Sequence, residues 1–169
     1  VQSTLVRYKS DLTFANDLAT DYELSPDGLV WTFKIRDDAK FTDGEKVTAE
    51  DVAFTLETAK AAKGSVDLTY MKSAVAKDDT TVEITLSTPT SIFLNTLASV
   101  GIVPKHAYGD DYGRNPIGSG PYKFVEWQSQ EKLVFVANED YYGGAPAIKN
   151  VTVVFMSEDA ALAAVQKGD

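Results

Sequence analysis

The fold of this chain is decided by one segment, Ser25-Pro26-Asp27-Gly28-Leu29-Val30-Trp31-Thr32-Phe33-Lys34-Ile35. Its first four residues predict a tight turn, because proline presets φ and an Asp-Gly pair favours a turn. In the remainder, Trp31, Phe33 and Ile35 share one face of an extended strand and polar residues share the other. With residues 21–24 as its partner strand, the segment predicts a β-hairpin whose aromatic face is buried.

Three helices are expected outside this hairpin. Residues 48–51 match the capping pattern that precedes an apolar helical stripe, and Gly64 is expected to end that helix. Residues 91–97 could form two helical turns, and Ser157 is expected to cap a last helix over residues 158–166. The side chains expected to face inward are Val52, Leu56 and Ala59 in the first helix and Leu162 and Val165 in the last.

Further strands are expected where apolar and polar residues alternate. The first of these segments starts at Ala74 and ends at the turn formed by Asp78-Asp79. The others are residues 82–86, 122–127, 132–137 and 151–155, of which residues 122–127 and 132–137 form another hairpin. Combined with the helices, the pattern predicts an α+β domain with about seven strands, arranged as a mixed sheet with hairpins, and about three helices.

The composition narrows the classes of partner. Of the 169 residues, 16 are Lys or Arg and 25 are Asp or Glu, which gives a formal net charge of −9. The electrostatic field of this negative charge repels nucleic acid and anionic membranes, so we expect neither as a partner. There is no cysteine, which excludes thiolate chemistry and disulfides. No apolar run approaches the roughly 18 residues of a spanning helix. Because the chain starts at Val1 and stops as a helix ends, we expect a segment of a longer polypeptide.

The residues that could carry catalysis or bind metal are better explained as surface and turn residues. His106 is the only histidine, and no G-x-S-x-G motif supplies a nucleophile for it, so a surface histidine is favoured. Neighbouring side chains in an extended segment point to opposite faces, which favours solvated turns over joint action for the acidic pairs. These pairs are Asp37-Asp38, Asp78-Asp79 and Asp110-Asp111. We therefore expect no catalytic residues, no metal and no cofactor.

The densest cluster of glycine and proline is Asn115-Pro116-Ile117-Gly118-Ser119-Gly120-Pro121. No P-loop lysine follows it, so we expect no nucleotide site here. Glycine does allow close approach to the backbone, and the approaching group could be a ligand or another strand. Four aromatic residues could stack on a ligand, but their strand spacing favours the core or the sheet surface: Tyr122, Trp127, Tyr141 and Tyr142.

The order of several motifs resembles the extracellular solute-binding proteins of family 5, the oligopeptide, dipeptide and nickel receptors of ABC importers. In the first part of the chain the matching motifs are Leu18-Ala19, Ser25-Pro26-Asp27-Gly28, Trp31 to Arg36, Lys40 to Gly44 and Val47 to Val52. In the second part they are Ile102 to Lys105, Asn115 to Tyr122, Asn138 to Gly143, Pro146 and Ala163 to Asp169. The resemblance covers almost the whole chain.

The resemblance implies a two-lobed receptor with a periplasmic-binding-protein type II-like fold, of which residues 1–169 would be most of the first lobe. Such a receptor would enclose a peptide-sized solute between its lobes and deliver it to an ABC permease in the membrane by hinge closure. Gly118, Ser119 and Gly120 match the family's loop near the cleft and are the expected ligand-binding residues. The resemblance further implies a monomer in the periplasm or outside the cell, with a lipid anchor possible only through N-terminal residues absent from this sequence.

One departure from the family pattern bears on the ligand. Nickel binders of the family carry an arginine near the stretch matching residues 97–101, and none stands there, which favours an organic solute over a metal complex. A peptide, a nickel complex and an oligosaccharide all stay open as ligands. Two other functions also stay open, an extracellular hydrolase domain and a sensory or interaction module that binds a small solute without transport.

Overall fold

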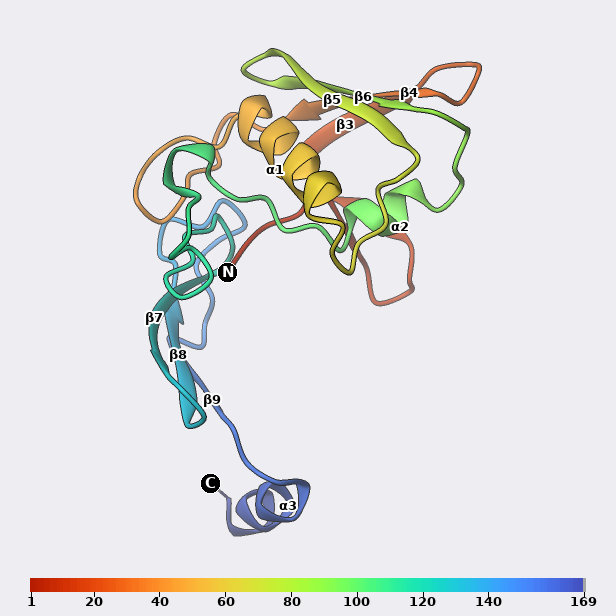
Figure 1. Cartoon of the computed structure of the whole chain (residues 1–169). Helices are drawn as coiled ribbons and strands as arrows, with labels where there is room; N and C mark the ends of the chain where they lie inside the picture. Colours follow the sequence, from red (N-terminus) through yellow and green to blue (C-terminus); the bar gives the residue numbers. More distant parts are fainter. Residues whose placement is uncertain (169) are drawn as a thin grey trace.

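The computed structural model describes residues 1–168, and in this part of the chain three antiparallel sheets are accompanied by three α-helices and one short 3-10 helix. The largest sheet has the strand order β3-β4-β6-β5 (Figure 1). Its strands are β3 (Ala19–Leu24), β4 (Val30–Ile35), β5 (Met71–Asp78) and β6 (Thr81–Leu86). The α+β class is confirmed. The expected mixed sheet is replaced by antiparallel sheets, because short turns between consecutive strands favour antiparallel pairing.

The predicted hairpin around the turn at residues 25–28 is confirmed. Strands β3 and β4 pair with Leu24 opposite Trp31, and the Gly28 amide donates to the Ser25 carbonyl oxygen over 2.8 Å. Gly28 has a φ of 74°, a left-handed conformation that glycine adopts without strain. The predicted aromatic face is buried in the core, where Trp31 contacts Phe93 at a ring-centroid distance of 5.6 Å.

Helix α1 (Ala49–Ala62) packs against β5 and β6 and begins at the predicted cap. Val52 and Leu56 are fully buried against the sheet. The predicted stop was displaced by one residue, because the left-handed C-cap is Lys63 and not Gly64. Helix α2 (Phe93–Leu97) is short and buries its two terminal side chains in the same core.

Two short strands were not predicted. They are β1 (Val6–Tyr8) and β2 (Phe14–Asn16), which pair only with each other. Three residues are too few to show an alternating pattern, so the sequence predicted about seven strands where the described residues form nine.

A separate three-stranded sheet extends away from this body (Figure 1). It consists of β7 (Tyr122–Gln128), β8 (Lys132–Ala137) and β9 (Asn150–Val154), in that order. The predicted hairpin between β7 and β8 is confirmed, with Trp127 opposite Leu133. Between the two sheets the chain forms η1 (Lys105–Ala107), a single 3-10 turn.

The last helix, α3 (Glu158–Lys167), is capped as predicted, since the Ser157 hydroxyl accepts a hydrogen bond from the Ala160 amide over 3.3 Å. The expectation that Leu162 and Val165 face inward was wrong in this structure. Their exposed fractions are 60% and 74%, because α3 extends beyond β9 and no other element among residues 1–168 covers it (Figure 1). None of the described helices is long and apolar enough to cross a membrane.

Candidate functional site

The predicted ligand loop, Gly118 to Gly120, is buried and lies just before β7. Three different segments hold it by hydrogen bonds. The Gly120 amide donates to the Val1 carbonyl oxygen (2.7 Å), and the Thr42 amide donates to the Gly118 carbonyl oxygen (2.9 Å). The Asn138 side-chain amide donates to the Gly120 carbonyl oxygen (3.0 Å). The loop is therefore fixed by the N-terminal segment, by the turn after β4 and by the segment after β8.

Both glycines are required by the close approach of the N-terminal backbone. A Cβ atom on Gly118 would lie 2.3 Å from the Val1 carbonyl oxygen, and one on Gly120 would lie 2.5 Å from the same atom. The sequence left a ligand or another strand as the approaching group, and here the N-terminal segment fills that space. Between the glycines, the buried Ser119 hydroxyl has no hydrogen-bond partner among the described residues. Contact between this loop and a solute stays a prediction.

His106 lies in η1 at the surface, as the sequence favoured. Its Nε2 atom is 2.6 Å from a carboxylate oxygen of Asp43, and both side chains are partly exposed. This hydrogen bond raises the pKa of His106 above its ordinary value, with a smaller contribution from the charges of neighbouring carboxylates. The sequence contained no signal that would have paired these two residues, which are 63 positions apart.

The acidic pairs are solvated turn residues, as predicted. All six side chains are exposed: Asp37, Asp38, Asp78, Asp79, Asp110 and Asp111. Asp78 shows their local role, since its carboxylate accepts a hydrogen bond from the Thr80 amide over 2.9 Å. That bond stabilises the charged form and lowers the pKa of Asp78. In the described part of the chain, no group of three or more acidic, histidine or cysteine side chains could hold a metal ion.

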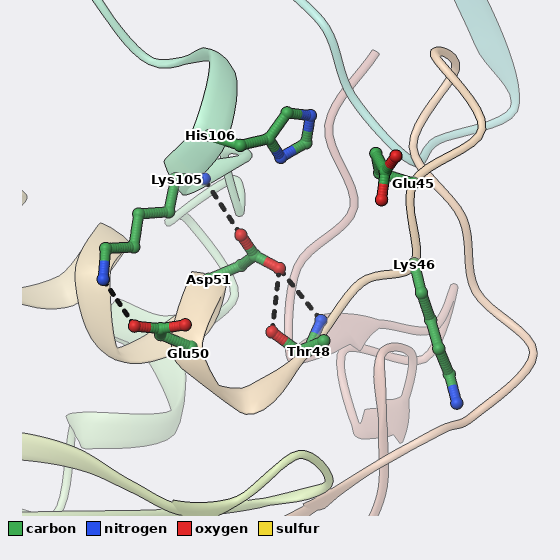
Figure 2. Close-up of a pocket in the computed structure, with 7 residues that line it drawn as sticks. All are labelled: Glu45, Lys46, Thr48, Glu50, Asp51, Lys105 and His106. Carbon is green, nitrogen blue, oxygen red and sulfur yellow. Dashed lines mark hydrogen bonds and ion pairs between the residues drawn. The ribbon is translucent and has the colours of Figure 1, made fainter.

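An open polar pocket of about 520 Å³ lies over the first turn of α1 (Figure 2). Its lining residues are Glu45, Lys46, Thr48, Glu50, Asp51, Lys105 and His106. At its floor the buried Asp51 carboxylate accepts from the backbone amides of Thr48 and Lys105, each over 2.9 Å. Glu50 forms an ion pair with the Lys105 side chain. These groups are thus engaged in capping α1 and in attaching η1 to it.

A second hollow, of about 330 Å³, is mainly apolar and lies beside β7 and β8. Its lining residues are Val1, Gln2, Gly113, Pro116, Phe124, Trp127, Leu133, Phe135 and Phe155. Of the four aromatic candidates from the sequence, only Trp127 lines it, with an exposed fraction of 42% and the Arg114 guanidinium 5.3 Å from its ring. Tyr122 instead donates to the Ile148 carbonyl oxygen, and the ring of Tyr141 contacts that of Tyr142 in a tilted arrangement.

Comparison with known protein families identifies the class of this chain. Residues 13–169 match the model of the bacterial extracellular solute-binding proteins, family 5, and the chain belongs to that family. The resemblance derived from the motifs is thereby confirmed.

Individual relatives have different solutes. The chain is 36% identical to the oligopeptide-binding protein AppA of Bacillus subtilis, over 99% of this chain and 34% of that protein. It is similar in structure to AppA of Bacillus subtilis in complex with a nonapeptide (TM-score 0.93, 32% identity, 100% of this chain and 37% of that one). It is also similar to NikZ of Campylobacter jejuni in complex with Ni(L-His) (TM-score 0.93, 34% identity, 99% of this chain and 36% of that one).

The matches cover nearly all of this chain but only part of each relative. The chain spans about a third of the length of the curated relatives it matches. The glutathione-binding protein GsiB of Pectobacterium atrosepticum is a further example, at 35% identity over 88% of this chain and 31% of that protein. The solute-binding proteins of the family are periplasmic or extracellular.

Proposed function

We propose that residues 1–169 are most of the first lobe of a two-lobed receptor that captures an extracytoplasmic solute for an ABC importer. The favoured solute is a peptide, which a closing second lobe would enclose and which a membrane permease would receive. The observation that carries this proposal is the match to peptide-binding AppA, which extends over the entire chain while leaving most of AppA unmatched. Family membership supports the same function.

The two open hollows support the view that this lobe carries only one side of the solute-binding site. The polar and the apolar hollow both lie open at the surface of this lobe, and a small-molecule site normally encloses most of its ligand. In our proposal the second lobe supplies the remaining walls, and the solute shifts the population towards the closed form because it binds that form better. The receptor would act as a monomer, in the periplasm or attached to the outer face of the membrane by an N-terminal lipid.

Calorimetry of the longer polypeptide that contains this chain, titrated with a defined mixture of short peptides, tests the proposal. We expect saturable heat and recovery of every peptide intact by mass spectrometry. Cleaved peptides would support the hydrolase alternative instead. The absence of any peptide binding, together with saturable binding of another small solute, would refute the peptide as ligand.

A further inference from the structure

The described residues form two parts whose regular elements hardly touch each other. We call β1 to β6 with α1 and α2 the large body, and β7, β8 and β9 the small sheet. The extensive contacts between elements all lie within one part or the other. Parts joined by a small interface are expected to move relative to each other unless specific contacts hold them. Their relative orientation therefore depends on loops.

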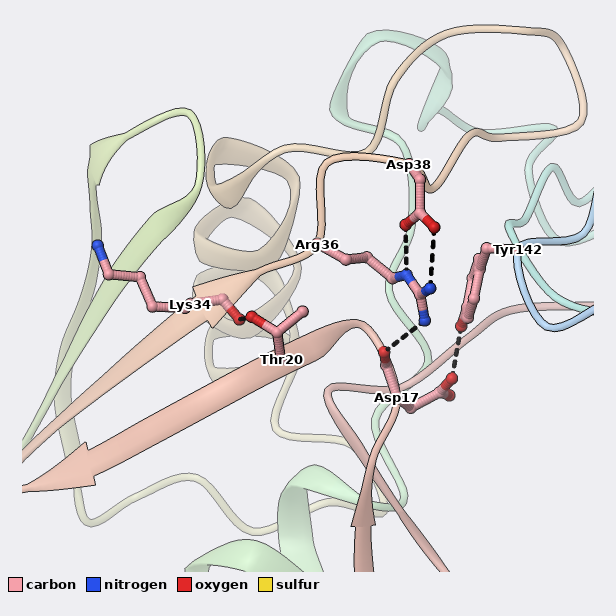
Figure 3. A network of polar contacts seen from close by, with 6 residues as sticks. All are labelled: Asp17, Thr20, Lys34, Arg36, Asp38 and Tyr142. Atoms are coloured by element: carbon pink, nitrogen blue, oxygen red, sulfur yellow. Dashed lines mark hydrogen bonds and ion pairs between the residues drawn. The ribbon is translucent and has the colours of Figure 1, made fainter.

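One such contact joins the loop between β8 and β9 to the large body (Figure 3). The Tyr142 hydroxyl donates a hydrogen bond to the Asp17 carboxylate over 2.5 Å. The guanidinium carbon of Arg36 lies 4.0 Å from the centre of the Tyr142 ring, a distance at which cation and ring attract each other. Asp17 precedes β3 and Arg36 follows β4, so both groups belong to the large body.

The receiving groups are themselves held in place. Two nitrogens of Arg36 donate to the two carboxylate oxygens of Asp38, over 2.5 and 3.0 Å, and a third donates to the Asp17 carbonyl oxygen over 3.3 Å. A paired arrangement of this kind fixes the plane of the guanidinium. The second carboxylate oxygen of Asp17 accepts from the Thr4 amide over 3.3 Å. Asp17 and Arg36 of the large body are thus both held in fixed positions where they contact Tyr142.

The same loop also reaches the glycine loop. Asn138 is buried at its start and donates through its side chain to the Gly120 carbonyl oxygen, while its own amide donates to the Pro121 carbonyl oxygen over 2.8 Å. Only a few residues separate Asn138 from Tyr142, and a turn closed by the Tyr141 amide and the Asn138 carbonyl oxygen lies between them. The segment that carries Tyr142 is thus connected through Asn138 to the loop at residues 118–120.

We propose that Tyr142, seated against Asp17 and Arg36, is a clamp that sets the orientation of the small sheet relative to the large body and thereby positions residues 118–120. These three are positioning residues, and the proposal holds whatever the solute is. Burial and the hydrogen bond to Asp17 raise the pKa of Tyr142 well above its ordinary value. The Tyr142 hydroxyl therefore keeps its proton near neutral pH and can donate its hydrogen bond to Asp17.

The clamp can be tested by measuring a distance across the two parts. The chain has no cysteine, so Glu23→Cys in β3 and Ser129→Cys in the exposed turn after β7 place one spin label on each part. Pulsed electron resonance on the 169-residue chain then reports the distribution of distances between the labels. Tyr142→Phe removes only the hydroxyl, and Asp17→Ala removes the carboxylate that accepts its hydrogen bond.

The matched control is Tyr122→Phe, which removes a hydroxyl whose hydrogen bond to the Ile148 carbonyl oxygen lies outside the large body. We expect a single narrow distance in the parent and in Tyr122→Phe, and loss of that narrow peak in Tyr142→Phe and in Asp17→Ala. An unchanged peak in Tyr142→Phe, even with a lowered melting temperature, would overturn the proposal. If circular dichroism shows Tyr142→Phe to be unfolded, the peak in Asp17→Ala decides in the same way.

Discussion

At the scale of single residues, the glycines at 118 and 120 show how a sequence signal can be clear while its cause is open. Glycine indicates close approach, but the approaching group lies more than a hundred positions away in the chain, at Val1. The same holds for Tyr142 and Asp17, which are 125 positions apart. Local patterns carry no information on such pairs, so the anchoring of the candidate site could not be predicted from the sequence.

We predict that Gly120→Ala destabilises the chain. Its methyl group would lie 2.5 Å from the Val1 carbonyl oxygen, and backbone atoms cannot move aside as a flexible side chain can. Such overpacking costs about 1–3 kcal/mol of the free energy of unfolding. Urea denaturation measures the loss, and Gly113→Ala is the control, since its methyl group would enter open space. Equal stability of the two variants would contradict the steric interpretation.

The pairing of His106 with Asp43 predicts a titration shift. Because the hydrogen bond raises the pKa of His106 in the folded chain, the protonated imidazole stabilises the fold. That contribution is complete below the pKa of the unfolded chain, about 6.5, and is lost as the pH rises through the higher pKa of the folded chain. NMR titration of His106 should give a pKa above the ordinary value, and Asp43→Asn should lower it. A midpoint that Asp43→Asn leaves unchanged would contradict this cause.

At the scale of elements, most of what the sequence predicted was local. The hairpin from the turn at residues 25–28 and the start of α1 both depend on short-range signals, and both formed as expected. The burial of α3 depends instead on what packs against it. The prediction that its side chains at 162 and 165 are buried was therefore wrong, although the predicted cap at Ser157 was correct. Capping signals position a helix start, whereas packing decides which face is covered.

The two capped helices allow a matched prediction. Asp51→Ala removes a buried carboxylate that accepts two backbone amides and leaves both donors without a partner. We expect a loss of about 2 kcal/mol in the free energy of unfolding, measured by urea denaturation. Ser157→Ala removes the cap of α3, which is not packed on the core, and should change the same quantity by less than about 0.5 kcal/mol. Comparable losses in both variants would mean that α3 is coupled to the core.

At the scale of the whole molecule, the fold class and the family followed from the sequence because many motifs occur in the family's order along nearly the entire chain. Their number compensates for the weakness of each one. No motif in the sequence indicated the division into a large body and a small sheet, because that division depends on which elements make few contacts with each other.

We predict that the 169-residue chain alone gives no saturable heat with short peptides at millimolar concentration. In the proposed receptor, groups on the second lobe and the exclusion of water supply much of the affinity, and an open half-site has neither. Titration calorimetry with the same peptides used for the longer polypeptide checks this. Saturable binding by these residues alone would place the solute site within this lobe.

The packing of Val1 against residues 118 and 120 offers a rule for comparing homologous chains. Where a relative carries alanine or any larger residue at either aligned position, its first residues must follow a different path across the molecule, because two atoms cannot occupy one space. A survey of family sequences could then sort them by the course of their opening segment without solving a single new structure.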